Sequence, residues 1–251
     1  MTLEVCCGDL ESVLAAKAGG AQRIELCSAL SEGGLTPSLG LIEQAIGSGI
    51  KAVNVLIRPR KGDFLYTEGE IAEMESDIRH AVKAGAAGVV IGALTPDGDV
   101  DVAACRRMIA AARSCAGRAD VSVTFHRAFD LCRDPEKSLE EIISLGCDRI
   151  LTSGLAPSAL EGLPTLRRLN TLAAGRIIIL AGGGVTSSNV RQILSGAGLT
   201  ELHASAKKSV GSGMRFRRND VSMAAPGNDE YSRQVTDSAE VAEMVALMQN
   251  P

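Results

Sequence analysis

Alternating apolar and polar positions mark short strands along this chain. In VSVTFHRAFD, which begins at Val121, apolar residues at every second position alternate with Ser122, Thr124 and His126. A period of two is typical of a strand that buries one face. The same pattern predicts eight strands, over residues 3–6, 23–28, 52–59, 88–94, 121–129, 149–153, 177–182 and 201–206.

Helical patterns separate these strands. Between residues 68 and 85, for example, Ile71, Met74, Ile78 and Val82 lie on one helical face. Phrases such as AVKAGAAGVVIGAL join a helix end, a glycine suited to a helix C-cap and an apolar strand. Strands that alternate with helices favour a parallel sheet, and eight such units predict one α/β domain over residues 1–251, a (β/α)8 TIM barrel. An open doubly wound sheet is the alternative.

The segment 207–235 follows the last predicted strand and shows no clear periodicity. We therefore expect a long loop there. Long loops inside compact domains usually serve a function. This one is expected to be a lid over the barrel mouth, an oligomer interface or a partly disordered segment.

Side-chain direction follows from the alternation. In a barrel, one set of strand residues faces the helices and the alternate set faces the lumen. The apolar set, for example Leu3 and Val5, is expected to face the helices. The set left for the lumen is unusually polar: Glu4, Cys6, Arg23, Glu25, Cys27, Asn54, Arg58, Ser122, Thr124, His126, Glu201, His203 and Ser205. Buried charges need partners, so Arg23 and His203 are expected to neutralise the glutamates.

Two cysteines end neighbouring strands at the face where barrels keep their active sites. Cys6 and Cys27 both point inward in this scheme, and adjacent strands lie about 4.8 Å apart. Paired thiolates suit Cu(I), a soft ion, whereas zinc would need four ligands. The alternative is that both thiols are only small buried hydrophobes.

A second set of rim residues suits an anion or an enzyme. His126, Arg127 and Asp130 could supply a general acid or base, an anion clamp and an orienting carboxylate, and Glu25 and Arg58 are further catalytic candidates.

Arg58 and Arg60 in the loop after the third strand suggest an anionic ligand. The alternative for this pair is a salt-bridge network with Asp63 or Glu32.

The glycine run after the seventh strand adds to this picture. Barrels often bind phosphate with backbone N–H groups of the loops after strands seven and eight. Gly182, Gly183 and Gly184 are therefore candidates for anion binding, together with Ser205. The alternative is a sharp turn.

Composition limits the classes of function. The net charge of −4 gives no reason to expect nucleic acid. No apolar run approaches the roughly 18 residues of a membrane helix, and the N-terminus does not resemble a signal peptide. Seven cysteines, an odd number, do not suggest a disulfide framework. We expect a cytoplasmic protein without a membrane partner.

Several blocks of the chain closely resemble the CutC family, named for copper homeostasis. They include LEVCCGDLESVLAAKAGGAQRIELCSALSEGGLTPS, VLIRPRKGDFLYTEGEI, VTFHRAFD, AGGGVTSSN and ELHASAKKS. The resemblance implies a cytoplasmic TIM barrel that forms dimers or tetramers and binds Cu(I). Cys6 and Cys27 match the cysteines proposed as ligands. Cys7 stands where many relatives have a residue other than cysteine, and Ala204 stands where some relatives have cysteine. Both differences leave the pair Cys6 and Cys27 intact.

Two functions are therefore in view. The resemblance favours a copper homeostasis protein that binds Cu(I) at the mouth, and it implies no reaction. The arginines, the histidine and the glycine turn favour an enzyme or sensor for a small anionic or phosphorylated metabolite.

Overall fold

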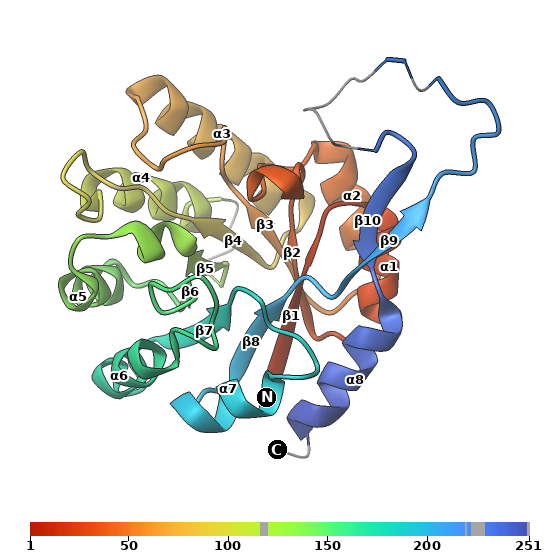
Figure 1. Ribbon diagram of the computed structural model, residues 1–251. Helices are drawn as coiled ribbons and strands as arrows, with labels where there is room; N and C mark the ends of the chain where they lie inside the picture. Colours follow the sequence, from red (N-terminus) through yellow and green to blue (C-terminus); the bar gives the residue numbers. More distant parts are fainter. Residues whose placement is uncertain (116–119, 219, 222–228, 250–251) are drawn as a thin grey trace.

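A computed structural model describes residues 1–115, 120–218, 220–221 and 229–249. Eight parallel strands close into a barrel in the order of the sequence, which confirms the predicted (β/α)8 fold and excludes the open sheet (Figure 1). The barrel strands are β1 (Thr2–Cys7), β2 (Arg23–Leu26), β3 (Val53–Leu56), β4 (Gly88–Ile91), β5 (Ser122–Phe125), β6 (Arg149–Thr152), β7 (Ile178–Gly182) and β8 (Glu201–Ala204).

Helices cover the outside of the barrel and several begin at a capping side chain. Asp9 and Ser38 each accept a hydrogen bond from the first turn of their helix, and Thr67 forms a capping box with Glu70. The helices are α1 (Leu10–Ala18), α2 (Leu39–Gly47), α3 (Glu68–Ala84), α4 (Val102–Arg113), α5 (Pro135–Leu145), α6 (Leu163–Ala173), α7 (Val190–Ala197) and α8 (Ser238–Gln249). Among the described residues, none of these helices is both long and apolar enough to cross a membrane.

All the predicted strands except the first are longer than the observed ones, and the third and fifth differ most. Strand β3 ends at Leu56 and β5 ends at Phe125, although apolar residues continue beyond both ends. Ile57 and Phe129 are completely buried in the rim loops, so burial there does not require a strand. His126 begins the short 3-10 helix η2 (Arg127–Leu131), because its Nδ1 accepts a hydrogen bond from the backbone N–H of Ala128.

The core confirms the predicted side-chain directions. Leu3, Val5 and Cys7 are fully buried in the main core between sheet and helices. Cys27, Leu56 and Val90 form a separate small apolar cluster. The alternation along each strand therefore separates the two environments.

Below that cluster the lumen holds an ionic network. The guanidinium of Arg23 donates to Glu4 and, at 2.5 Å, to Glu201. Nδ1 of His203 lies 2.9 Å from a carboxylate oxygen of Glu4, as the expected neutralisation requires. Arg149 also donates to Glu201, at 2.8 Å. Its inward direction follows from the same alternation, since the next residue, Ile150, lies in the main core on the helix side. Each buried charge here has a partner of opposite sign.

The segment expected to be a loop contains two strands. Strands β9 (Lys207–Gly211) and β10 (Ser232–Thr236) pair in antiparallel fashion and lie beside α1 (Figure 1). The backbone N–H of Thr236 donates to Ser12 in α1, at 3.2 Å. The two strands are about 20 residues apart in the sequence, so no short turn motif predicts that they pair. Residues 219 and 222–228 lie outside the described residues.

Candidate metal centre

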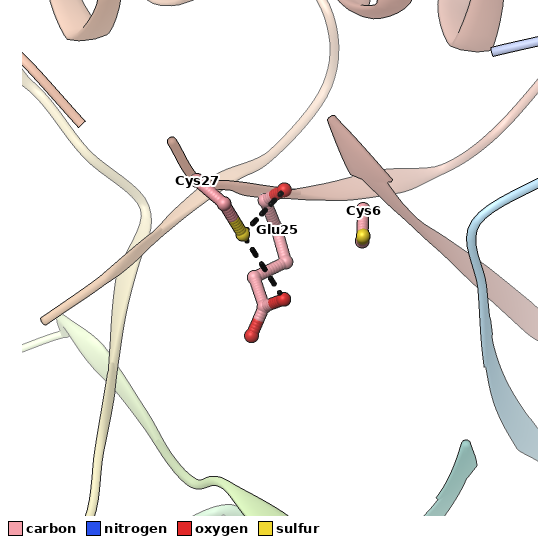
Figure 2. A group of neighbouring side chains, drawn as sticks. All are labelled: Cys6, Glu25 and Cys27. Atoms are coloured by element: carbon pink, nitrogen blue, oxygen red, sulfur yellow. Dashed lines mark hydrogen bonds between the residues drawn. The ribbon is translucent and has the colours of Figure 1, made fainter. Parts of the chain in front are cut away.

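Strands β1 and β2 bring two thiols and one carboxylate together. Cys6 pairs in register with Glu25, and Cys27 follows directly after β2 on the same inward face as Glu25. The Sγ atoms of both cysteines and a carboxylate oxygen of Glu25 all lie within 4.8 Å of one another. The thiol of Cys27 donates to that carboxylate at 3.3 Å, as Figure 2 shows. The structure thus unites Cys6 and Cys27 and adds Glu25, which the sequence suggested only as a catalytic candidate.

Electrostatics favour one thiolate in this group. A hydrogen bond from Cys27 lowers the pKa of Cys6 to about 5, against the effect of burial and with help from His203. The pKa of Cys27 is raised, because this thiol donates to Cys6 and is buried. None of the seven cysteines forms a disulfide.

His203 of β8 connects this group to the network below. Its Nε2 lies 3.8 Å from Glu25. Burial would lower the pKa of His203, but hydrogen bonds to Cys6 and Glu4 raise it well above its usual value. Burial raises the pKa of Glu25 to about 7. For Glu4, burial is outweighed by the hydrogen bond from His203 and the charge of Arg23, so its pKa falls to about 2.

A cavity of about 610 Å³ opens beside the group. Cys6 is half-buried and lines it, whereas Glu25 and Cys27 are buried behind. The hairpin β9–β10 forms much of the wall. The other lining residues are Gly8, Asp9, Ser12, Ala29, Leu30, Ser31, Ser205, Lys207, Asp229, Glu230, Ser232, Arg233, Gln234, Val235 and Thr236. The cavity gives solvent a route to one of the two thiols.

The two arginines of the loop after β3 bind the protein itself. Arg58 is buried and donates to the backbone oxygens of Glu32, Gly34 and Gly62 at 2.7–3.1 Å. Arg60 is partly exposed. It pairs with Glu70, and with Asp63 at 3.1 Å. The salt-bridge alternative therefore describes Arg60, and neither side chain lines the cavity at Cys6.

His126 is enclosed at the β5 end of the rim. It is 4% exposed, and its ring centre lies 4.9 Å from that of Phe64. Burial, aided by the charge of Arg58, lowers the pKa of His126 to about 3, so the imidazole is neutral. Its Nε2 has no hydrogen-bond partner among the described residues. This environment separates His126 from the thiols.

Arg127 and Asp130 hold the turn after β6. The Asp130 carboxylate accepts from Arg127 at 2.7 Å, from the hydroxyl of Thr152, and from the backbone of Ser153 and Leu155 at 3.1–3.2 Å. These bonds occupy both oxygens of Asp130, so the carboxylate stabilises this turn.

The three glycines at the end of β7 and in the loop after it lie in two different neighbourhoods. A Cβ on Gly182 would lie 3.2 Å from the Cβ of His203, so this glycine permits close packing in the lumen. Gly183 has a φ of +106° and lies next to Ser153 and the guanidinium of Arg127. Gly184, with a φ of +70°, is also in the left-handed region that a sharp turn requires. Ser205 instead lines the cavity at Cys6.

Comparison with known proteins settles the family. Residues 1–208 match the CutC family. The chain belongs to the CutC family. The human copper homeostasis protein cutC homolog is 48% identical over 249 residues, which cover 99% of this chain and 89% of that protein. A CutC family protein of Chromobacterium violaceum is 48% identical, over 95% of this chain and 94% of its own.

Solved structures agree with this assignment. A putative copper homeostasis protein CutC from Streptococcus agalactiae superposes with a TM-score of 0.76 at 32% identity, over 82% of this chain and 98% of that chain. A thiamine phosphate pyrophosphorylase from Pyrococcus furiosus has a TM-score of 0.58 at 15% identity, over 99% of this chain and 96% of that chain. The second likeness concerns the barrel fold alone.

Proposed function

We propose that this CutC family member binds Cu(I) through Cys6 and Cys27 in a copper homeostasis role. The observation that carries the proposal is the grouping of both sulfurs with the Glu25 carboxylate within 4.8 Å, one of the thiols facing a cavity. The relatives named for copper homeostasis support the same role.

The donor set fits a soft monovalent ion. Metal–thiolate bonds of about 2.3 Å, the length known for zinc, span two sulfurs that lie up to roughly 4.6 Å apart. Cu(I) is satisfied by few soft ligands, whereas a structural zinc ion takes four. Cys6, Glu25 and Cys27 are the group that the described residues offer, which is one ligand short of a structural zinc site.

The carboxylate of Glu25 is a proton acceptor for the neighbouring thiol. A thiol must lose its proton to bind a metal. The thiol of Cys27 donates to Glu25 at 3.3 Å, and the raised pKa of that buried carboxyl lets it accept a proton near neutral pH. Glu25 is therefore proposed to receive the Cys27 proton when Cu(I) arrives.

A double substitution tests the ligand assignment. The metal-free protein and the C6S/C27S variant are titrated with Cu(I) against a chromophoric Cu(I) chelator under anaerobic conditions. The parent is expected to hold about one Cu(I) per chain at a concentration where the variant holds none. C7S is the matched control, because Cys7 adjoins Cys6 but is buried on the helix side. A double variant that competes with the chelator as the parent does would disprove the assignment.

The proposal includes a cytoplasmic location and a homo-oligomer, either dimer or tetramer. Light scattering on the purified protein tests the second part, and fractionation of cells that express it tests the first. A monomer, or a protein recovered with membranes or culture medium, would contradict the respective part.

One observation favours the other function, an enzyme or sensor for a small anionic or phosphorylated metabolite. The side chain of Arg127 is 46% exposed. Its guanidinium lies so close to Gly183 that a Cβ on this glycine would be in van der Waals contact with it. A charged fork beside a glycine turn suits an anion. Thermal unfolding in phosphate tests this candidate: parent protein but not R127Q should be stabilised.

A further inference from the structure

The cavity beside Cys6 is much larger than an ion requires. It measures about 610 Å³, whereas one water takes up about 30 Å³ of the liquid and small-molecule pockets measure roughly 300–1,000 Å³. Of the three grouped side chains, Cys6 lines the cavity and the other two are buried. Cargo from solvent therefore meets Cys6 first, and there is room for a molecule that carries it.

The cavity wall carries charges of both signs. Lys207 and Arg233 project from the hairpin, and Asp9 and Asp229 lie on the same wall. Arg233 is 3.6 Å from Asp9 and also pairs with Glu11. Cationic side chains bind carboxylates and aspartates bind ammonium groups, so this lining suits a zwitterion better than a simple anion.

We propose that this cavity binds a low-molecular-weight thiol peptide of the glutathione type, which carries Cu(I) to Cys6. The proposal rests on the copper function above and names the class of its substrate. The peptide's carboxylates would lie at Lys207 and Arg233, its ammonium group at an aspartate, and its sulfur beside Cys6.

The transfer is a ligand exchange without oxidation or reduction. The Cys6 sulfur forms a bond to Cu(I), and the bond between Cu(I) and the peptide sulfur breaks. Cys6 enters the exchange as a thiolate and the peptide leaves as a thiolate. Cys27 then adds its sulfur to Cu(I), and the proton of this thiol passes to Glu25. Copper stays in the +1 state, and the number of protons and charges is the same before and after.

Stopped-flow loading of metal-free protein with copper(I)–glutathione tests this proposal. The initial rate should saturate with the concentration of the complex, and S-methylglutathione, which lacks the thiol, should inhibit. K207Q should raise the half-saturating concentration about fivefold, the effect of roughly one lost ion pair. K208Q is the matched control: Lys208 is the next residue of β9, pairs with Asp237 at 3.1 Å and does not line the cavity.

The outcomes separate this inference from the copper function. Copper(I)–acetonitrile, a carrier without charges for the cavity, should load parent and K207Q protein equally. A rate that rises linearly with copper(I)–glutathione, no inhibition by S-methylglutathione, or equal effects of K207Q and K208Q would overturn the peptide site. Efficient loading from a copper-carrying protein alone would also overturn it. Failure to load from copper(I)–acetonitrile would instead refute the copper function.

Discussion

Two sides of the same barrel rim have polar inward residues but different surroundings. On the β1–β2 side, Cys6 reaches a cavity of about 610 Å³ and lies beside a buried thiol and carboxylate. On the β3–β5 side, Arg58 and His126 are at most 7% exposed, and both lie against Phe64. Similar strand positions therefore lead to an accessible group on one side and an enclosed one on the other.

The loops that cover each side account for the difference. After β3, loop carbonyls accept from both terminal nitrogens of the Arg58 guanidinium, and the ring of Phe64 packs against the His126 imidazole. Over β1, the hairpin β9–β10 stands beside the mouth and leaves space between itself and Cys6. Inward direction alone does not make a residue available for a ligand, because the covering segments decide solvent access.

The largest effect is expected on Cu(I) affinity, when one residue from each side of the rim is substituted. C27S should weaken Cu(I) binding more than about 100-fold, since even partners outside a ligand set contribute about 10–100-fold. H126N should change the Cu(I) affinity less than about twofold. The reason is that the described contacts of the His126 side chain do not include a residue that also contacts the two thiols. Competition with a Cu(I) chelator measures both. Equal losses in the two variants would show that the sides act as one site.

A glycine tests how tightly the β3–β5 side is enclosed. A Cβ on Gly92 would lie 2.5 Å from the ring of His126, so G92A should lower the free energy of unfolding by about 2–3 kcal/mol. In the control G40A, nothing lies within 4 Å of the new Cβ in α2, and a gain of about 0.5–1 kcal/mol is expected. Urea unfolding distinguishes the two. A neutral G92A would mean that the imidazole moves easily.

The pH dependence of stability tests the buried carboxyl on the β1–β2 side. Burial raises the pKa of Glu25 from 4.5 to about 7. Its contribution to stability is therefore complete below pH 4.5 and is lost as the pH rises toward 7. In metal-free protein this loss amounts to at most about 1.4 kcal/mol per pH unit. E25Q should remove it, and unfolding curves with the same pH dependence in both proteins would contradict the assignment.

The smallest effect is expected at Arg60. Its side chain is 38% exposed and pairs with Asp63 and Glu70, and such pairs contribute about 0–1 kcal/mol. R60M should therefore lower the unfolding free energy by less than about 1 kcal/mol and leave Cu(I) affinity unchanged. A loss of affinity in this variant would connect the two sides of the rim.

Much of the fold could be predicted from local patterns. Alternation along each strand gave the inward and outward sets, and eight repeats of strand and helix gave the barrel. The pairing of Cys6 with Cys27 was predictable because both end neighbouring inward-facing strands. Glu25 could have been added to them, since it lies two residues before Cys27 and so shares its face.

Other features had no local pattern to reveal them. The hairpin β9–β10 pairs strands about 20 residues apart, and its alternation is weak because consecutive residues along both strands are exposed to solvent. The enclosure of His126 depends on Phe64, which comes from a loop more than 60 residues earlier in the chain. In the sequence Arg58 resembles an anion-binding residue and Asp130 an orienting carboxylate, and their backbone partners become visible only in three dimensions.

The sequence by itself determined which side chains point into the barrel, because a strand turns alternate residues to opposite faces whatever lies around it. Only the tertiary structure decided which of those inward groups line a cavity, which have a charged or hydrogen-bonding partner, and which are buried under covering segments. That outcome depends on segments distant in the chain, whose packing no local period encodes. Cys6 lines a cavity and His126 does not, although both lie at the carboxyl ends of their strands and face inward.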